Sequence, residues 1–274
     1  MYATDFEFAG EKLSDYGMMI CNFDGAGGIE TVSSGADITF NQIKTSASNY
    51  FNIISSDYDS SYSTTFQICK NPCLVNSQEE MIISPTEISA LQRWLCRKNQ
   101  FYRLKIDQTD YEHLYWNATF TSKQITLNGN IIGMELTPYT DAPFAYMDEV
   151  VIEEKCTENS SFDIYDVSDE EGYIYPNLTI HLQENGEFIL SNKFGNNIIS
   201  KMSIANCSQD EIITIDGRNQ IISTSCSTHT TLPKDFNYFF PKIFNTYAES
   251  KNTFTCNLKC KITISYSPVR KVGL

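Results

Sequence analysis

The sequence predicts a mainly β protein of the β-rich α+β class, built from two domains. At 274 residues the chain is near the length at which a single hydrophobic core stops growing. Its 16 tyrosines and 17 phenylalanines, together with abundant isoleucine and threonine, favour strands over helices. We place the domain boundary where the composition becomes acidic. The expected domains are therefore an N-terminal one over 1–147 and a C-terminal one over 148–274.

Short strands separated by polar turns are predicted over residues 1–83. Phe6 and Phe8 alternate with polar residues, as the inward-facing side chains of a strand do, and a second apolar run covers 18–23. Residues 50–73 predict two further strands around a loop rich in serine and aspartate.

One helix is predicted, in "SPTEISALQRWLCRKN". Ser84 is the expected N-cap, Pro85 the first helical residue, and Glu87 completes a capping box with Ser84. Arg97 and Lys98 are expected in the last turn, where cations suit the helix dipole. Ile88, Leu91 and Leu95 form an apolar stripe at helical spacing, with Trp94 alongside.

Three strand-like runs follow the helix: "FYRLKI", "YWNATFTSKQITLNG" and "IIGMELTPYT". The last two meet at Asn128-Gly129-Asn130. Since Asn-Gly between apolar runs is a strong hairpin signal, we expect a tight turn there.

Residues 148–171 carry ten acidic residues and a single base. We interpret this run as a solvated connector with its flanking strand edge. Adjacent carboxylates point to opposite faces of a strand, and nothing apolar nearby would raise their pKa. We therefore expect no catalytic pair at Glu153/Glu154 or Glu170/Glu171.

The rest of the chain reads as short alternating strands, which favour a β-sandwich. In "EIITIDGRNQIIST" the centre could be a cation-binding loop or a hairpin turn. Asp216, Gly217 and Asn219 are turn formers, and Arg218 stands where a cation would need another oxygen ligand. We therefore predict a hairpin. The strand-like runs are "YIYPNLTIHLQ", "EFILSN", "IISKMSIANC", "EIITIDGRNQIIST", "FNYFFPKIF" and "NTFTCNLKCKITISY".

The net charge of −14 argues against binding to nucleic-acid phosphates or to an anionic membrane surface. Residues 1–149 hold 19 acidic and 9 basic residues, a balance of −10. The first residues lack the basic and apolar regions of a secretory signal, and no apolar run reaches about 18–20 residues. We therefore expect a chain made and folded in the cytoplasm, with reduced thiols.

Nine cysteines are spread along the chain, and two pairs have C-x₃-C spacing: Cys69/Cys73 and Cys256/Cys260. The strong zinc signature repeats C-x₂-C at a short interval, whereas these pairs lie almost 190 residues apart and the chain has three histidines. Cys256, Leu258 and Cys260 alternate as residues on one strand face do. We expect buried structural thiols, with a metal site as the less favoured alternative.

No motif for catalysis or nucleotide binding is present. The glycines of "GAGG" at 25–28 lack the G-x-G-x-x-G spacing and a following helix, so we expect a loop. A G-x-S-x-G elbow, a Walker A loop and H-E-x-x-H are missing, and His181 in "LTIHLQ" reads as a strand residue. We therefore predict no enzyme, no cofactor, and no catalytic, cofactor-binding or metal-binding residues.

Two sets of segments resemble the distal tail protein (Dit) family of bacteriophage tails. In the first half they are "FEFAGEKLSDYGM", "EISALQRWLCRKNQFYRLKI" and "GNIIGMELTPYTDAPFAY". In the second half they are "YIYPNLTI", "EIITIDGRNQIIST", "NYFFPKIF" and "KITISYSPVRKVG". Together they cover nearly the whole chain in the expected order.

The resemblance implies an N-terminal belt domain of β-sandwich type with one helix, and a C-terminal galectin-like β-sandwich. It implies a structural protein of the virion, made in the host cytoplasm, that forms a hexameric ring, or stacked rings, at the tail tip. The implied partners are the major tail or tube protein, the tail-associated lysin or hub protein, and receptor-binding proteins, with no membrane. Genomic DNA would pass through without specific binding, and an acidic first half would repel its phosphates.

The alternative is a galectin-like adhesion protein that binds host cell-wall carbohydrate. Such binding relies on an aromatic platform, usually Trp, yet both Trp94 and Trp116 lie in the first half. The last 24 residues carry five bases and no acid. They form either a solvated strand edge or a surface that meets an acidic neighbour, such as an adjacent subunit or the run at 148–171.

Overall fold

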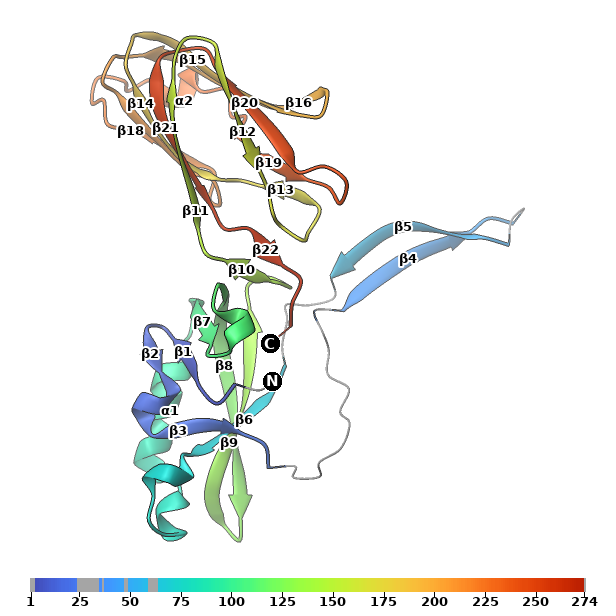
Figure 1. Ribbon diagram of the computed structural model, residues 1–274, viewed down its shortest axis with the longest axis vertical. Helices are drawn as coiled ribbons and strands as arrows, with labels where there is room; N and C mark the ends of the chain where they lie inside the picture. The colour runs from blue at the N-terminus through green and yellow to red at the C-terminus, as the bar shows by residue number, and fades with distance from the viewer. Residues whose placement is uncertain (1–2, 24–34, 36, 47–48, 59–63, 274) are drawn as a thin grey trace. The chain divides into compact units, whose positions relative to one another are not determined.

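The computed structural model divides into two compact units, each drawn in Figure 1. Unit 1 comprises residues 1–147 and 270–274, and unit 2 comprises 148–269. The structure describes residues 3–23, 35, 37–46, 49–58 and 64–273, so the loop expected at 25–28 lies outside the described residues. The last residues, 270–274, belong to unit 1, whereas the expected C-terminal domain extended over 148–274.

Unit 1 is built on a nine-stranded sheet. Its main path runs β2-β1-β7-β8-β9-β6-β3, while β10 pairs with β8 and β22 pairs with β10. The strands are β1 (Phe6–Phe8), β2 (Glu11–Lys12), β3 (Met18–Cys21), β6 (Phe66–Lys70), β7 (Tyr102–Ile106), β8 (Leu114–Leu127), β9 (Asn130–Thr140), β10 (Ala145–Met147) and β22 (Val269–Arg270). Short 3₁₀ helices cover Leu13–Tyr16, Pro72–Leu74, Glu79–Met81 and Thr109–Tyr111.

Helix α1 (Pro85–Leu95) packs on this sheet and confirms the predicted helix. It ends before Arg97 and Lys98, so the cation in its last turn is Arg93. Ser84 accepts a hydrogen bond from the Glu87 N–H, and the Glu87 side chain accepts one from the Ser84 N–H, which is the predicted capping box. The predicted apolar stripe is buried in the core of unit 1. Trp94 stacks on Phe6, and its indole N–H donates to the Phe8 carbonyl over 2.9 Å, so one side chain joins helix to sheet.

The predicted Asn-Gly turn joins β8 to β9, the two longest strands of unit 1. Leu127 pairs with Asn130, and the two residues between them have positive φ angles, 50° at Asn128 and 82° at Gly129. This is the two-residue hairpin that an Asn-Gly pair favours, because both residues tolerate the left-handed conformation.

Unit 2 is a β-sandwich. One sheet has the order β11-β21-β14-β17-β18 and the other β12-β20-β15-β16, with β13 and β19 as a separate pair. The strands are β11 (Val150–Cys156), β12 (Ser160–Tyr165), β13 (Gly172–Ile174), β14 (Asn177–Leu182), β15 (Gly186–Phe194), β16 (Asn197–Cys207), β17 (Ile212–Asp216), β18 (Ile221–Thr224), β19 (Ile243–Asn245), β20 (Lys251–Cys256) and β21 (Cys260–Tyr266). Alternate side chains of the two sheets form one apolar core, as sandwich packing requires.

Two predictions about unit 2 need correction. The acidic run at 148–171 is not mainly a connector, because it contributes β11 and β12, each the edge strand of its sheet. Only the flanking strand edge of that interpretation is confirmed. In β11 exposed residues alternate with half-buried or buried ones, as in a strand with one face toward the core, and Glu153 is on the exposed face. The run "FNYFFPKIF" forms a strand only at β19. Residues 237–242 have no regular structure, and a short helix, α2 (Leu232–Asp235), precedes them.

The segment 210–224 is the predicted hairpin, β17 followed by β18. Asp216 pairs with Ile221 across the turn and accepts hydrogen bonds from the backbone N–H and the side-chain amide of Asn219, at 3.0 and 2.8 Å. The mainly β class with one long helix is thus confirmed for the described residues. None of the helices found there is long and apolar enough to cross a membrane.

Candidate functional site

The most unusual surface in the described chain is a hairpin formed by β4 (Ile38–Lys44) and β5 (Phe51–Tyr58). These two strands form a sheet of their own. Every side chain on them is exposed except Tyr58, which is half-buried. A strand with no buried face differs from the alternating strands of both cores, so burial within its own subunit does not explain its sequence.

One face of the hairpin carries most of its apolar side chains, together with Gln42, Lys44 and Ser56. Directly paired residues of antiparallel strands share a face, and the register pairs Phe51 with Lys44 and Ile53 with Gln42. Alternation along β4 adds Ile38 and Phe40 to the same face. We call Ile38, Phe40, Phe51 and Ile53 the apolar face; their side chains are 41%, 53%, 64% and 59% exposed.

The opposite face is mainly polar. Asn41 donates a hydrogen bond to Ser55 across the strands, at 2.9 Å. Ile43 also lies on this face, opposite Asn52, and is 49% exposed. The register shifts by one residue between Asn41 and Gln42, which leaves Ile54 as an additional residue of β5.

Such a hairpin needs a partner. A two-stranded hairpin on its own is at best marginally stable in water, and a contiguous exposed apolar patch marks an interaction site. Its outer edges also carry backbone donors and acceptors without a strand partner among the described residues, which is a template for further pairing. The apolar face and these edges are the features of an assembly surface.

Two acidic residues of the run at 148–171, one of them from the pair Glu153/Glu154, form ion pairs across neighbouring strands. Glu153 forms an ion pair of 2.8 Å with Lys261, across the pairing of β11 with β21. Lys251 pairs with Asp163 at 3.0 Å, across β12 and β20. These contacts agree with the interpretation that the basic C-terminal residues meet the acidic run. His181 is exposed on β14, as its strand pattern predicted.

Sequence reasoning missed a buried polar network in unit 2. His229 Nδ1 lies 2.7 Å from a Glu211 carboxylate oxygen, and Nε2 lies 3.2 Å from Asp235. Thr224 donates to Glu211, and Thr231 donates to Asp235. His229 and Glu211 are 6% and 2% exposed.

No spacing in the sequence links the three titratable residues of this network. Burial lowers the pKa of His229, but its hydrogen bonds and attraction to Glu211 and then Asp235 outweigh this, so the pKa is raised above its usual 6.5. Burial raises the pKa of Glu211, but hydrogen bonds from Thr224 and the Ser208 N–H, with His229, hold it below its ordinary value. The two threonine hydroxyls donate to carboxylates rather than to His229. The imidazole therefore lies between two hydrogen-bonded carboxylates, as in a structural ion-pair network.

The two C-x₃-C pairs have different surroundings. Cys69 is buried and Cys73 is exposed, so these two residues do not form a buried thiol pair. Cys256 and Cys260 are both buried, as expected, and Cys156 joins them. The sulfur atoms of these three residues all lie within 4.8 Å of one another. The sequence pattern did not include Cys156, because strand pairing alone brings it there.

The tryptophans considered for a sugar platform are both buried in the core of unit 1. Exposed aromatic residues of unit 2 are Tyr165, Tyr173, Tyr238, Phe239 and Tyr247. None of these exposed residues is a tryptophan, the residue that usually forms a sugar-binding platform.

The chain matches two family descriptions over nearly its whole length. Residues 1–142 match the phage tail protein N-terminal domain, and residues 144–266 match the phage tail C-terminal domain. The protein therefore belongs to this family of phage tail proteins. No curated protein sequence matches it.

Solved structures show the same fold. The crystal structure of the Dit protein of phage SPP1, described as a paradigm of the hub adsorption apparatus in phages that infect Gram-positive bacteria, has a TM-score of 0.67 at 10% identity. The match covers 96% of this chain and 98% of that one. A chain of the phage P2 baseplate in its activated conformation with Ca matches with a TM-score of 0.50 at 11% identity, over 97% and 98%. The fold that the resemblance to the Dit family implies is thus confirmed, and the chain belongs to a family of phage tail proteins.

Proposed function

We propose that this protein forms a hexameric ring at the distal end of a phage tail, where it connects the tail tube to the tail-tip hub. The observation that carries the proposal is the apolar face of the β4–β5 hairpin. Family membership and the fold shared with the SPP1 hub protein support a tail-tip role.

A second copy of the same chain is the occupant we assign to the apolar face. In a ring, each hairpin packs on a different surface of the next subunit, and this head-to-tail arrangement closes when the rotation is right. Burying an isoleucine or phenylalanine side chain contributes about 1.5–3 kcal/mol, so four such residues supply a substantial interface core.

The charge suits a conduit for DNA. A balance of −10 over residues 1–149, repeated around a ring, repels phosphates and prevents the genome from adhering as it passes. The further partners are the tube protein on one side and the lysin, hub or receptor-binding proteins on the other. A cryo-EM ring with a neutral or basic lumen would remove this support.

A matched pair of substitutions tests the interface. Ile53→Asp places a charge on the apolar face, whereas Ile43→Asp makes the same change on the opposite face of the same hairpin. Burying an unpaired carboxylate costs more than about 1–3 kcal/mol per interface. We expect light scattering to give six or twelve copies for the wild type and for Ile43→Asp, and monomers for Ile53→Asp with unchanged circular dichroism.

Two outcomes contradict the proposal. One is a wild-type protein that stays monomeric at high concentration. The other is equal assembly of both variants, which would show that the apolar face is not an interface. Glycan-array binding by the purified protein at micromolar affinity or better would instead favour the carbohydrate-binding alternative.

A further inference from the structure

Three buried thiols meet at one end of the sandwich in unit 2. Cys156 ends β11 and lies directly opposite Cys260, the first residue of β21, in one sheet. Cys256 ends β20 in the other sheet, directly opposite Ser160, the first residue of β12. The links 156–160 and 256–260 therefore both cross between the sheets, and the pairings place them side by side.

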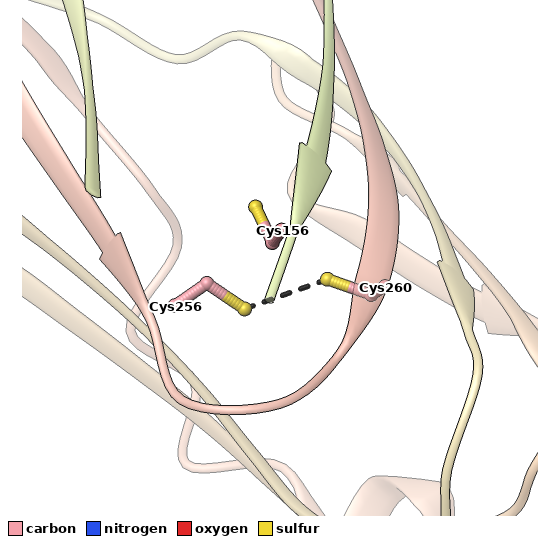
Figure 2. A group of neighbouring side chains, drawn as sticks. All are labelled: Cys156, Cys256 and Cys260. Atoms are coloured by element: carbon pink, nitrogen blue, oxygen red, sulfur yellow. Dashed lines mark hydrogen bonds between the residues drawn. The ribbon is translucent and has the colours of Figure 1, made fainter. Parts of the chain in front are cut away.

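The three sulfur atoms lie close together. Figure 2 shows the three cysteines as neighbours, with the sulfurs of Cys256 and Cys260 facing each other across the turn. The Cys256 and Cys260 sulfurs are 3.4 Å apart, and all three lie within 4.8 Å of one another. A tetrahedral zinc site with Zn–S bonds of about 2.3 Å has sulfurs about 3.8 Å apart, so small side-chain shifts produce the required geometry.

Three thiols and one hydroxyl lie at this end of the sandwich. The C-x₃-C link falls within the C-x₂₋₄-C spacing of structural zinc sites, and Cys156 supplies a third thiol. Ser160 lies directly opposite Cys256 in the pairing of β12 with β20, and its hydroxyl oxygen is buried. It is therefore the oxygen donor available at this end of the sandwich.

Packing alone explains the thiols less well. A free cysteine behaves as a small apolar residue, and the cross-strand neighbours Leu182 and Leu190 are apolar. Apolar packing, however, does not require three thiols from three different strands to meet at one point.

The donor set selects the class of cation. Soft thiolates favour thiophilic ions, whereas Mg²⁺ and Ca²⁺ require carboxylate and carbonyl oxygens. The group of three contains no carboxylate and no histidine. Zn²⁺ with three thiolates and one oxygen ligand is four-coordinate.

We propose that Cys156, Cys256 and Cys260 bind one Zn²⁺ as thiolates, with the Ser160 hydroxyl in position for the fourth ligand. Binding releases the thiol protons to solvent and changes no oxidation state. The ion ties together both links between the two sheets, so its role is structural. This inference is independent of the proposed ring.

Metal content of the full-length protein tests the proposal directly. The protein is purified under reducing conditions, dialysed against EDTA and analysed for zinc by mass spectrometry, before and after reloading with Zn²⁺. We expect about one zinc per chain in the wild type and in Cys73→Ser, which alters the exposed member of the other C-x₃-C pair. Cys156→Ala and Cys256→Ala should bind at least about ten-fold more weakly.

Two measurements remain informative if those variants fold poorly. In the wild type, added Zn²⁺ should raise the Tm of the EDTA-treated protein and protect the three thiols, but not Cys73, from alkylation. Co²⁺ should give the thiolate charge-transfer absorption of a tetrahedral sulfur site. Ser160→Ala should weaken zinc binding while keeping that absorption, and unchanged affinity would overturn the assignment of Ser160.

The proposal fails if the wild type reloads no zinc and Co²⁺ gives no thiolate absorption. It also fails if Cys256 and Cys260 are joined by a disulfide in protein isolated without exposure to air. Equal zinc loss in Cys73→Ser and Cys256→Ala would likewise overturn it.

Discussion

At the scale of single residues, Gly217 in the β17–β18 turn has no room for a side chain. A Cβ there would lie 2.3 Å from the carbonyl oxygens of both Tyr175 and Pro176. The Gly217 N–H also donates to the Asn177 side chain at 3.0 Å, which holds the turn against the neighbouring strand β14. Gly217→Ala should therefore lower the free energy of unfolding of unit 2 by about 1–3 kcal/mol, measured by urea denaturation.

The control is Gly35→Ala. A Cβ at Gly35 meets no atom within 4 Å, and the φ angle there is not in the left-handed region. This substitution should leave the urea midpoint nearly unchanged. Equal destabilisation by both variants would mean that the close approach at Gly217 has no energetic effect.

His229 makes stability depend on pH. The pKa of His229 is raised in the folded state. Its contribution to the free energy of unfolding is therefore fully present below the unfolded-state pKa of about 6.5, and it is lost as the pH rises through the folded-state pKa. The pKa of Glu211 is lowered in the folded state. Its contribution to the free energy of unfolding is therefore present above the unfolded-state pKa, and it is lost as the pH falls through the folded-state pKa. Stability of unit 2 should therefore peak in mildly acidic solution.

The measurement is the urea midpoint of the wild type and of His229→Gln at mildly acidic and mildly alkaline pH. The wild type should lose stability as the pH rises above about 6.5, whereas the variant should be less stable by about 1–3 kcal/mol and flat over that range. A wild-type midpoint that rises with pH in this window would contradict the assignment.

At the scale of elements, the capping box makes α1 sensitive to one hydroxyl. Ser84→Ala removes the acceptor for the Glu87 N–H and should destabilise unit 1 by about 1 kcal/mol. Ser89→Ala changes the same residue type at an exposed mid-helix position and should be neutral or slightly stabilising, because alanine has the higher helix propensity. Thermal unfolding compares them, and a larger loss for Ser89→Ala would be inconsistent with the cap.

Elements with a local cause could be predicted from the sequence. The Ser84 cap, the Asn128-Gly129 turn and the Asp216–Asn219 turn each depend on residues within four positions of one another. The segment 237–242 was mistaken for a strand because its apolar residues resemble one. Phe236 makes only an isolated bridge with Ile204, and its ring packs against Phe240 with 5.1 Å between the ring centroids.

At the scale of the whole molecule, the relevant features are the path of the chain between the two units and the distribution of its charges. The chain leaves unit 1 after Met147 and returns at Arg270, so both of its ends belong to unit 1. There the Tyr111 hydroxyl donates to the Gly273 carbonyl at 3.0 Å. Because the basic C-terminal strands pair with the acidic run, Lys251 and Lys261 locally neutralise Asp163 and Glu153 within unit 2.

The sequence by itself determined the β-rich class, the single long helix, the tight turns and the family resemblance, because these depend on short-range patterns and their order. Only the tertiary structure decided which distant residues meet. Cys156 joins Cys256 and Cys260 through the pairing of β11 with β21, and His229 meets Glu211 through packing. The exposure of the apolar hairpin face also became visible only there, since alternation predicts a strand but not what covers it.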